Sequence, residues 1–247
     1  MKYFWETVES LKADKIKGVG FERFGYTHAM WLIIAVIVCI AVCLLYKHLN
    51  ASGRKYARRA IAVLIITDEI FKVVCLFILD AFTAKYLPFQ LCTINIFVVA
   101  IHAIKPSEIL DNFLYAICIP ASIFPLMIPS WTELPLANFM HLHSFTVHIL
   151  LLLYPLMLTV GGDIIPNAKY IPHSLLLLLP MAVAAYIVNM NTKGTNFMFL
   201  KSASDIPMLT VFRDLCGNHL IGFPFLIAAV LAVMYVPVIV YRRVKRR

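Results

Sequence analysis

The chain has 247 residues, of which 62% are hydrophobic and only 14% are charged. This composition excludes an ordinary soluble domain. The formal net charge of +9 does not indicate a nucleic-acid-binding protein, because Lys and Arg gather beside apolar stretches, at residues 47–59 and in the final RRVKRR. Basic residues in such positions are signals of membrane topology. We therefore predict an integral membrane protein whose partners are membrane lipids.

The first 29 residues precede the first long apolar stretch and carry too much charge for a secretory signal peptide. In a helix, Phe4, Val8 and Leu11 share one face, with lysines around it. This pattern predicts an N-terminal interfacial segment, residues 1–29, at the level of the lipid headgroups. A frayed, solvated terminus is the alternative.

Seven apolar stretches follow, and a helical span needs roughly 17 to 25 such residues. They cover residues 30–46, 60–81, 87–104, 110–128, 134–160, 173–189 and 219–241. The fold class is therefore all-α, a polytopic membrane bundle of about seven transmembrane helices at residues 30–241, followed by a basic cytoplasmic tail at 242–247. With seven spans both basic clusters lie on one side, so we expect a multi-pass protein of the cell membrane, with its N-terminus outside and its C-terminus in the cytoplasm. The sequence leaves the oligomeric state open.

The third predicted span contains Gln90, Cys92 and Asn95 within six positions. Strongly polar side chains in a membrane span are rare, and they mark functional sites. Cys92, Asn95 and His102 recur at intervals of three and seven residues, so they share one helical face. The alternative is structural, because Asn and Gln also join helices by hydrogen bonds, and a membrane cysteine is often an inert apolar group.

The fifth predicted span carries a second polar stripe, formed by Asn138, His141 and His148 at the same spacing. His143 lies off this stripe. His141 and His148 are two helical turns apart, whereas a zinc-binding pair on a helix is spaced i and i+4. We therefore predict no metal site and no other cofactor.

The second predicted span contains three charged residues, Asp68, Glu69 and Lys72. Asp68 and Lys72 are four residues apart and could neutralise each other on one helical face. We expect Glu69 to face the same interior as the two polar stripes, either protonated or paired.

A thiol becomes a nucleophile when a base or a positive group stabilises its thiolate. If the stripes of the third and fifth spans meet, Cys92 has a base available in His141 or His148, and Asn95 or Gln90 could hold an oxyanion. The other polar groups that we expect to line a substrate site are Glu69, Asn138 and His141.

Several stretches resemble the YwaF-type family of bacterial integral membrane proteins, from about Phe21 to the C-terminus. They are FERFGYTHAMWL, LPFQLCTINIF, IFPLMIPSW, HSFTVHILLLLYP and NMNTKGTNFMFL. Members of that family often have His two residues before the Cys of LP-x-x-LC, whereas this chain has Gln90. The family is in turn distantly similar to eukaryotic membrane phospholipid acyltransferases that use a cysteine acyl-enzyme and a histidine. The resemblance implies Cys92 as the nucleophile and His148 as the base.

Three functions are compatible with these patterns. The first is a lipid acyltransferase or acyl hydrolase that uses the Cys92 thiol. The second is a transporter or proton-coupled permease, in which the charged second span and the histidines form a path for protons or substrate. The third is a non-catalytic scaffold whose polar residues only hold helices together.

Overall fold

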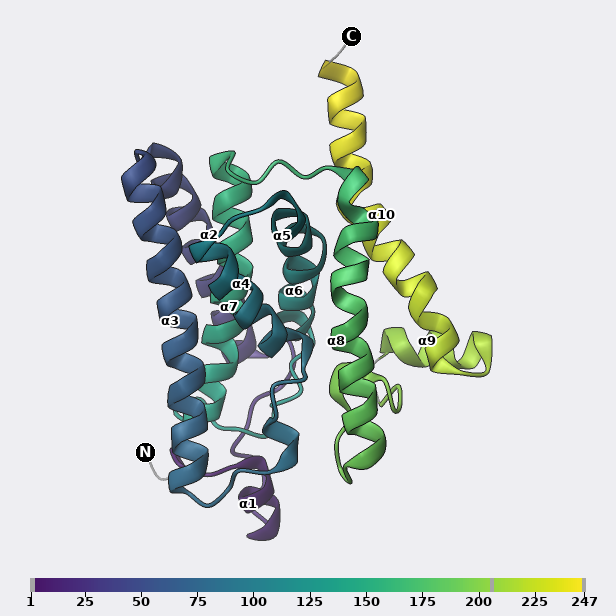
Figure 1. Ribbon diagram of the computed structural model, residues 1–247. Coiled ribbons are helices and arrows are strands. Elements are labelled where there is room, and N and C mark those ends of the chain that lie inside the picture. The colour runs from purple at the N-terminus through teal and green to yellow at the C-terminus, as the bar shows by residue number, and fades with distance from the viewer. Residues whose placement is uncertain (1–2, 205–206, 246–247) are drawn as a thin grey trace.

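The computed structural model describes residues 3–204 and 207–245, and within these ranges all regular structure is helical (Figure 1). The α-helices are α1 (Val8–Ala13), α2 (Tyr26–His48), α3 (Ala51–Ile78), α4 (Leu91–Ile104), α5 (Glu108–Phe113), α6 (Ile119–Met127), α7 (Phe139–Gly161), α8 (Ile171–Asn191), α9 (Pro207–Cys216) and α10 (His219–Lys245). Shorter turns are η1 (Ala84–Tyr86), the π-helical η2 (Leu114–Cys118), η3 (Ala168–Tyr170) and η4 (Phe197–Phe199). Residues 246 and 247 of the predicted basic tail lie outside the described ranges.

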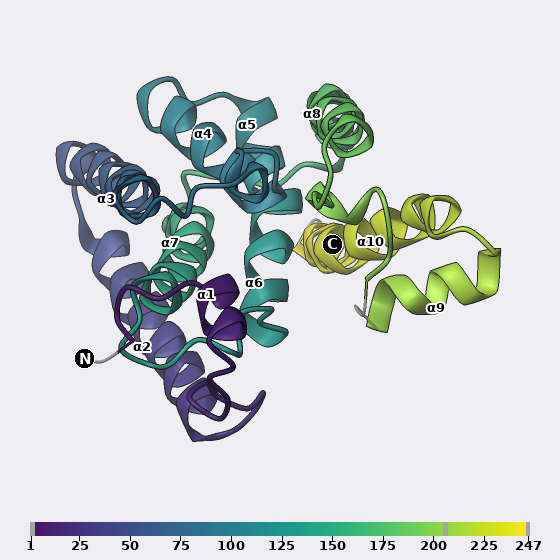
Figure 2. The same cartoon turned by 90° about the horizontal axis from the view of Figure 1, so that it is seen from below.

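Helix α7 is the centre of the bundle. It packs against α2, α3, α4 and α6 (Figures 1 and 2). In its 18-residue apolar stretch, 56% is buried by other parts of the protein. The fully buried Tyr154 and Leu151 belong to the main apolar core, to which α2, α3, α4 and the α5–η2 segment also turn their inner faces. Close packing of this kind fixes side-chain positions, so polar groups on the inner faces are held in place.

Helices α8, α9 and α10 stand to one side of this core (Figure 2). In the corresponding 18-residue apolar stretches, only 11% of that in α8 and 6% of that in α10 is buried by protein. Large apolar side chains of α8 and α10 are therefore exposed in the isolated chain, among them Leu176, Ile187, Phe225 and Val233. Such surfaces are expected of helices that face lipid rather than water.

The prediction of a polytopic helical membrane protein is confirmed, but the count of seven spans is not exact. Within the described residues, five helices are long and apolar enough to cross a membrane. Helix α3 is 28 residues long but contains the charged residues of the second predicted span. Helix α4 has only 14 residues, because the chain is non-helical before Leu91. Pro88 disfavours the helical conformation in Leu87, which is extended, so no helix runs unbroken from η1 into α4.

The fourth predicted span is one continuous rod with a change of pitch in its middle. Helix α5 passes through the π-helical η2 into α6, and Pro120 lies in the first turn of α6. Proline has no N–H donor, and its ring clashes with the carbonyl one turn earlier, so a local widening of the helix accommodates it. The hydroxyl of Ser122 donates to the carbonyl of Cys118 at 2.7 Å, which satisfies a backbone group in this region.

The N-terminal segment is part of the fold rather than a free tail. Leu11 of α1 is 2% exposed and packs in an apolar cluster with Trp131 and Phe145. The Asn138 carboxamide donates to the carbonyls of Tyr3 and Glu6 at 2.9 and 2.8 Å. The segment therefore covers the end of the bundle at which α7 begins, as Figure 2 shows for α1.

Candidate functional site

Four titratable side chains meet where α3 packs against α7. Nδ1 of His143 lies 2.8 Å from Oδ2 of Asp68, and its Nε2 lies 3.6 Å from Oε2 of Glu69. Nζ of Lys72 donates to Oε1 of Glu69 at 2.5 Å. We call Asp68, Glu69, Lys72 and His143 the ionic cluster. Their side chains are only 7% to 19% exposed, so their charges are compensated chiefly by one another.

The pairing inside the ionic cluster differs from the sequence prediction. Lys72 pairs with Glu69, three residues earlier, and not with Asp68. Asp68 instead faces His143, with an ion-pair distance but without hydrogen-bond geometry, since the two facing atoms have no hydrogen-bond partner among the described residues. The polar stripe predicted for the fifth span, now α7, did not include His143. A better signal was the surplus of carboxylates on α3, because two buried carboxylates require more than one cationic partner.

His148 is held in one orientation. Its Nδ1 lies 2.6 Å from the carbonyl oxygen of Ser144, which can only accept, so Nδ1 carries the proton. The indole of Trp131 stacks on the ring, with centroids 5.5 Å apart and planes 8° from parallel. In the neutral ring the lone pair is then on Nε2, which is buried without a partner among the described residues.

On α4, Asn95 is completely buried, and neither its carboxamide oxygen nor its nitrogen has a hydrogen-bond partner among the described residues. Buried amide groups without partners are rare in native proteins, so this group requires a ligand or water. Cys92 lies one turn earlier, in the first turn of α4, and is only partly buried. Helices α3, α4 and α7 pack against one another, so the ionic cluster, the first turn of α4 and the His148 turn of α7 border one polar interior.

Gln90 is the N-terminal cap position of α4, but its side chain does not cap the helix. Its Oε1 instead accepts from the backbone N–H of Met198 at 3.1 Å, and the ring of Phe89 lies 5.6 Å from that of Phe197. The loop after α8 is thereby attached beside the start of α4. The first-turn N–H groups of α4, which include that of Cys92, are left without a side-chain cap.

The other predicted residues lie elsewhere. The Asn138 carboxamide caps α7 through the N–H groups of Met140 and His141, besides its bonds to the N-terminal segment. His141 accepts from the indole of Trp31 at 2.9 Å, and its Nδ1 lies 3.2 Å from the carbonyl of Leu134. Neither side chain has a polar atom left for a ligand.

His102 shares the face of Cys92 but serves a different group. Its ring lies between the hydroxyl of Tyr154, at 2.8 Å, and the carboxylate of Asp111, at 2.7 Å. It is 1% exposed. His102 therefore joins α4 to α5 and α7 near the opposite end of α4 from Cys92.

The arrangement provides the groups that acyl transfer needs within one interior: a thiol at a helix N-terminus, a histidine with a free ring nitrogen, and an unpaired carboxamide. Helix N-termini stabilise thiolates and oxyanions. The ionic cluster lies on α3 and α7, two helices that pack against α4.

Comparison with known proteins returns one family. The model of the TMEM164 family, a family of membrane proteins, matches residues 23–236. No curated protein and no solved structure matches the chain. The matched region begins just before α2 and runs into α10, so it contains every residue of the polar interior described above. The chain therefore belongs to the TMEM164 family.

Proposed function

We propose that this protein is a membrane-embedded lipid acyltransferase or acyl hydrolase in which Cys92 is the nucleophile and His148 the base. The observation that carries the proposal is the set of buried polar atoms that lack a protein partner: both amide atoms of Asn95 and Nε2 of His148. Such atoms would be satisfied by the groups of a substrate. The resemblance to YwaF-type proteins, and more distantly to phospholipid acyltransferases, supports the same assignment.

The proposed reaction balances as two transfers. Nε2 of His148 takes the proton of the Cys92 thiol, and Sγ attacks the carbonyl carbon of a lipid ester. The ester C–O bond breaks, and the leaving alkoxide takes the proton from His148. An acceptor hydroxyl or water then attacks the thioester, with His148 again as base, and releases the thiol. The Asn95 amide and the uncapped N–H groups of α4 would stabilise the oxyanion in both steps.

Covalent trapping of the acyl-enzyme tests this proposal directly. Purified protein in detergent is incubated with a phospholipid that carries an alkyne-tagged acyl chain, and the label is located by peptide mass spectrometry. We expect one hydroxylamine-sensitive label on Cys92, absent from Cys92→Ala and present in the control Cys118→Ala. Absence of label from the wild type, or equal label on several cysteines, would contradict the thiol mechanism.

A proton-coupled permease remains the second candidate because of the ionic cluster. Asp68, Glu69 and Lys72 sum to one negative charge, and the His143 ring lies against both carboxylates. Proton-binding groups inside a membrane are typical of coupled transport. Proteoliposomes distinguish the two functions: a permease acidifies or alkalinises the lumen when its solute is supplied, whereas an acyltransferase changes the lipids and moves no protons.

We also propose that the end of the bundle with the α2–α3 connection lies in the cytoplasm. Arg54 of α3 donates to the carbonyl of Gly161 at 2.7 Å, and Arg242 of α10 donates to that of Pro166, also at 2.7 Å. Both basic clusters are therefore at one end, which is the end expected to be retained inside.

A membrane-impermeant maleimide should then label Lys193→Cys in intact cells, since this exposed residue follows α8 at the other end. We expect Ser52→Cys, at the start of α3, to be labelled only after the cells are permeabilised. The unsubstituted protein serves as the background control. The opposite pattern would reverse the orientation, and equal labelling of both sites in intact cells would refute it.

A further inference from the structure

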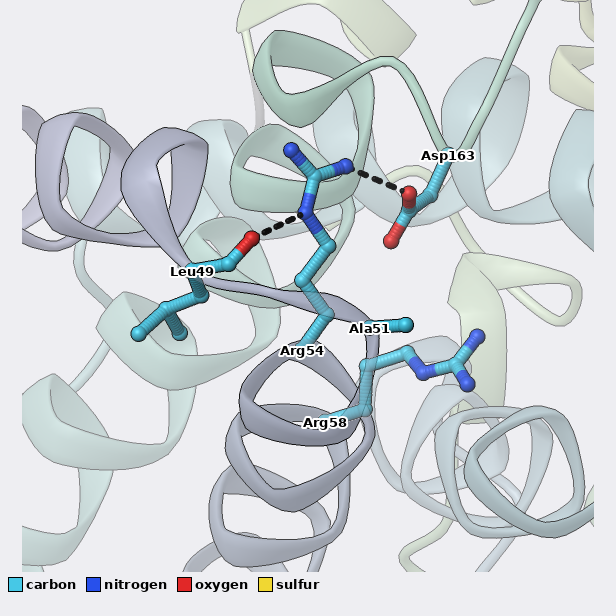
Figure 3. Close-up of a pocket in the computed structure, with 5 residues that line it drawn as sticks. All are labelled: Leu49, Ala51, Arg54, Arg58 and Asp163. Atoms are coloured by element: carbon cyan, nitrogen blue, oxygen red, sulfur yellow. Dashed lines mark hydrogen bonds and ion pairs between the residues drawn. The ribbon is translucent and has the colours of Figure 1, made fainter.

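A pocket of about 440 Å³ opens at the end of the bundle where α2 passes into α3. It is lined by Leu49, Ala51, Arg54, Arg58 and Asp163 (Figure 3). Arg58 and Glu69 are eleven residues apart on α3, which is about 16 Å along a helix. The pocket is therefore separate from the polar interior around Cys92, and a ligand bound in it would take no part in the proposed acyl transfer.

One wall of the pocket is a closed set of interactions. The Arg54 guanidinium donates to Oδ1 of Asp163 at 2.8 Å, and also to the backbone carbonyls of Gly161, Leu49 and Lys47. The other carboxylate oxygen of Asp163 accepts from the Tyr46 hydroxyl. A Cβ on Gly161 would lie 2.7 Å from the Tyr46 ring, so only glycine permits this approach. Arg54 and Asp163 thus neutralise each other and form a rigid wall.

Arg58 is different, because its charge is not compensated. Among the described residues it forms no ion pair with a carboxylate, and its buried Nε has no hydrogen-bond partner. Figure 3 shows Arg54 and Arg58 extending from successive turns of α3, with dashed interactions on Arg54 alone. Ala51, in the first turn of α3, also lines the pocket, so the positive end of this long helix opens on the same space.

We propose that this pocket binds a phosphate group, with Arg58 as its principal ligand. A guanidinium fork matches two phosphate oxygens, and a helix N-terminus adds to the attraction for an anion. The apolar wall formed by Leu49, and the position at the end of the bundle, suit the phosphodiester of a lipid headgroup. A free phosphate ion has the same chemistry, and the experiment separates these two sources.

The experiment measures the thermal midpoint of the full-length protein in a neutral maltoside detergent during titration with dioleoylphosphatidylglycerol. We expect the lipid to raise the midpoint by preferential binding to the folded protein. Arg58→Gln should weaken the apparent affinity at least about tenfold, because a charge-assisted hydrogen bond is lost. The matched control is Arg59→Gln, which removes the same charge from an exposed neighbour and should change affinity by less than about twofold.

Two further arms identify the source of the phosphate. Dioleoylglycerol, which lacks the phosphate, should give no shift. If inorganic phosphate competes with the lipid, the ion alone suffices; if it does not, the lipid headgroup is the ligand. Equal losses in Arg58→Gln and Arg59→Gln, or no lipid-dependent shift in the wild type, would overturn the proposal. If Arg58→Gln does not fold, Arg58→Lys provides the same comparison with Arg59→Lys, since lysine keeps the charge but loses the fork.

Discussion

Replacing Cys92 or His148 with alanine is expected to lower acyl transfer by roughly three orders of magnitude or more, because the two side chains act as one unit. The double variant should be scarcely slower than either single variant. The measurement is turnover of a labelled phospholipid by purified protein in mixed micelles. Little change in thermal stability is expected for Cys92→Ala, since the side chain is only partly buried.

Cys92→Ser and Cys118→Ala are the informative controls. Serine keeps size and polarity but lacks a readily formed thiolate, so it should be nearly as inactive as alanine. Cys118 is buried with its thiol 3.4 Å from the carbonyl of Leu151, and its loss should affect stability more than rate. A fully active Cys92→Ser variant would exclude a thiol nucleophile.

Lys72→Met is expected to be the most destabilising single change in the polar interior. Lys72 is the only lysine of the ionic cluster, and its side chain is 9% exposed. Removal of one partner from a buried pair leaves the other charge uncompensated, which costs about 3 to 5 kcal/mol. For a chain of this size we expect the thermal midpoint in detergent to fall by roughly 10 °C.

The double variant Lys72→Met with Glu69→Gln should recover much of that loss, because it removes both charges of the pair. Lys55→Met is the matched control, since Lys55 lies exposed on the same helix. Its thermal midpoint should change by no more than about 1 to 2 °C. A Lys72→Met variant as stable as the wild type would show that Lys72 does not hold the cluster together.

Much of the architecture could be predicted from hydrophobic stretches alone. All seven predicted spans correspond to helical rods, and Asn95 lies on the buried face that its spacing indicated. The late start of α4 could not be predicted from hydropathy, because an apolar stretch has the same hydropathy whether or not its first residues are helical. Pro88 was the available signal.

Partner choice was harder to predict than position. Spacing along α3 allows Lys72 to pair with either Asp68 or Glu69. Lys72 pairs with Glu69 in the structure, where His143 of α7 lies against Asp68. The sequence identified Arg58 only as one topology signal among several. Its lack of an ion pair among the described residues depends on the pairing of Arg54 with Asp163, which spacing along α3 does not reveal. The spacing of residues within one helix does not determine which residues it contacts on a neighbouring helix.

Helix α4 is shorter than the hydrocarbon layer that surrounds it. Its 14 residues extend over about 21 Å, whereas the layer is about 30 Å thick. Phe97, Ile101 and Ile104 are more than half exposed and face outward, so lipids border this helix. Bilayers adapt to a short segment by thinning. We therefore expect lipids beside α4 to be drawn inward, with their ester carbonyls nearer the depth of Cys92 than elsewhere in the membrane.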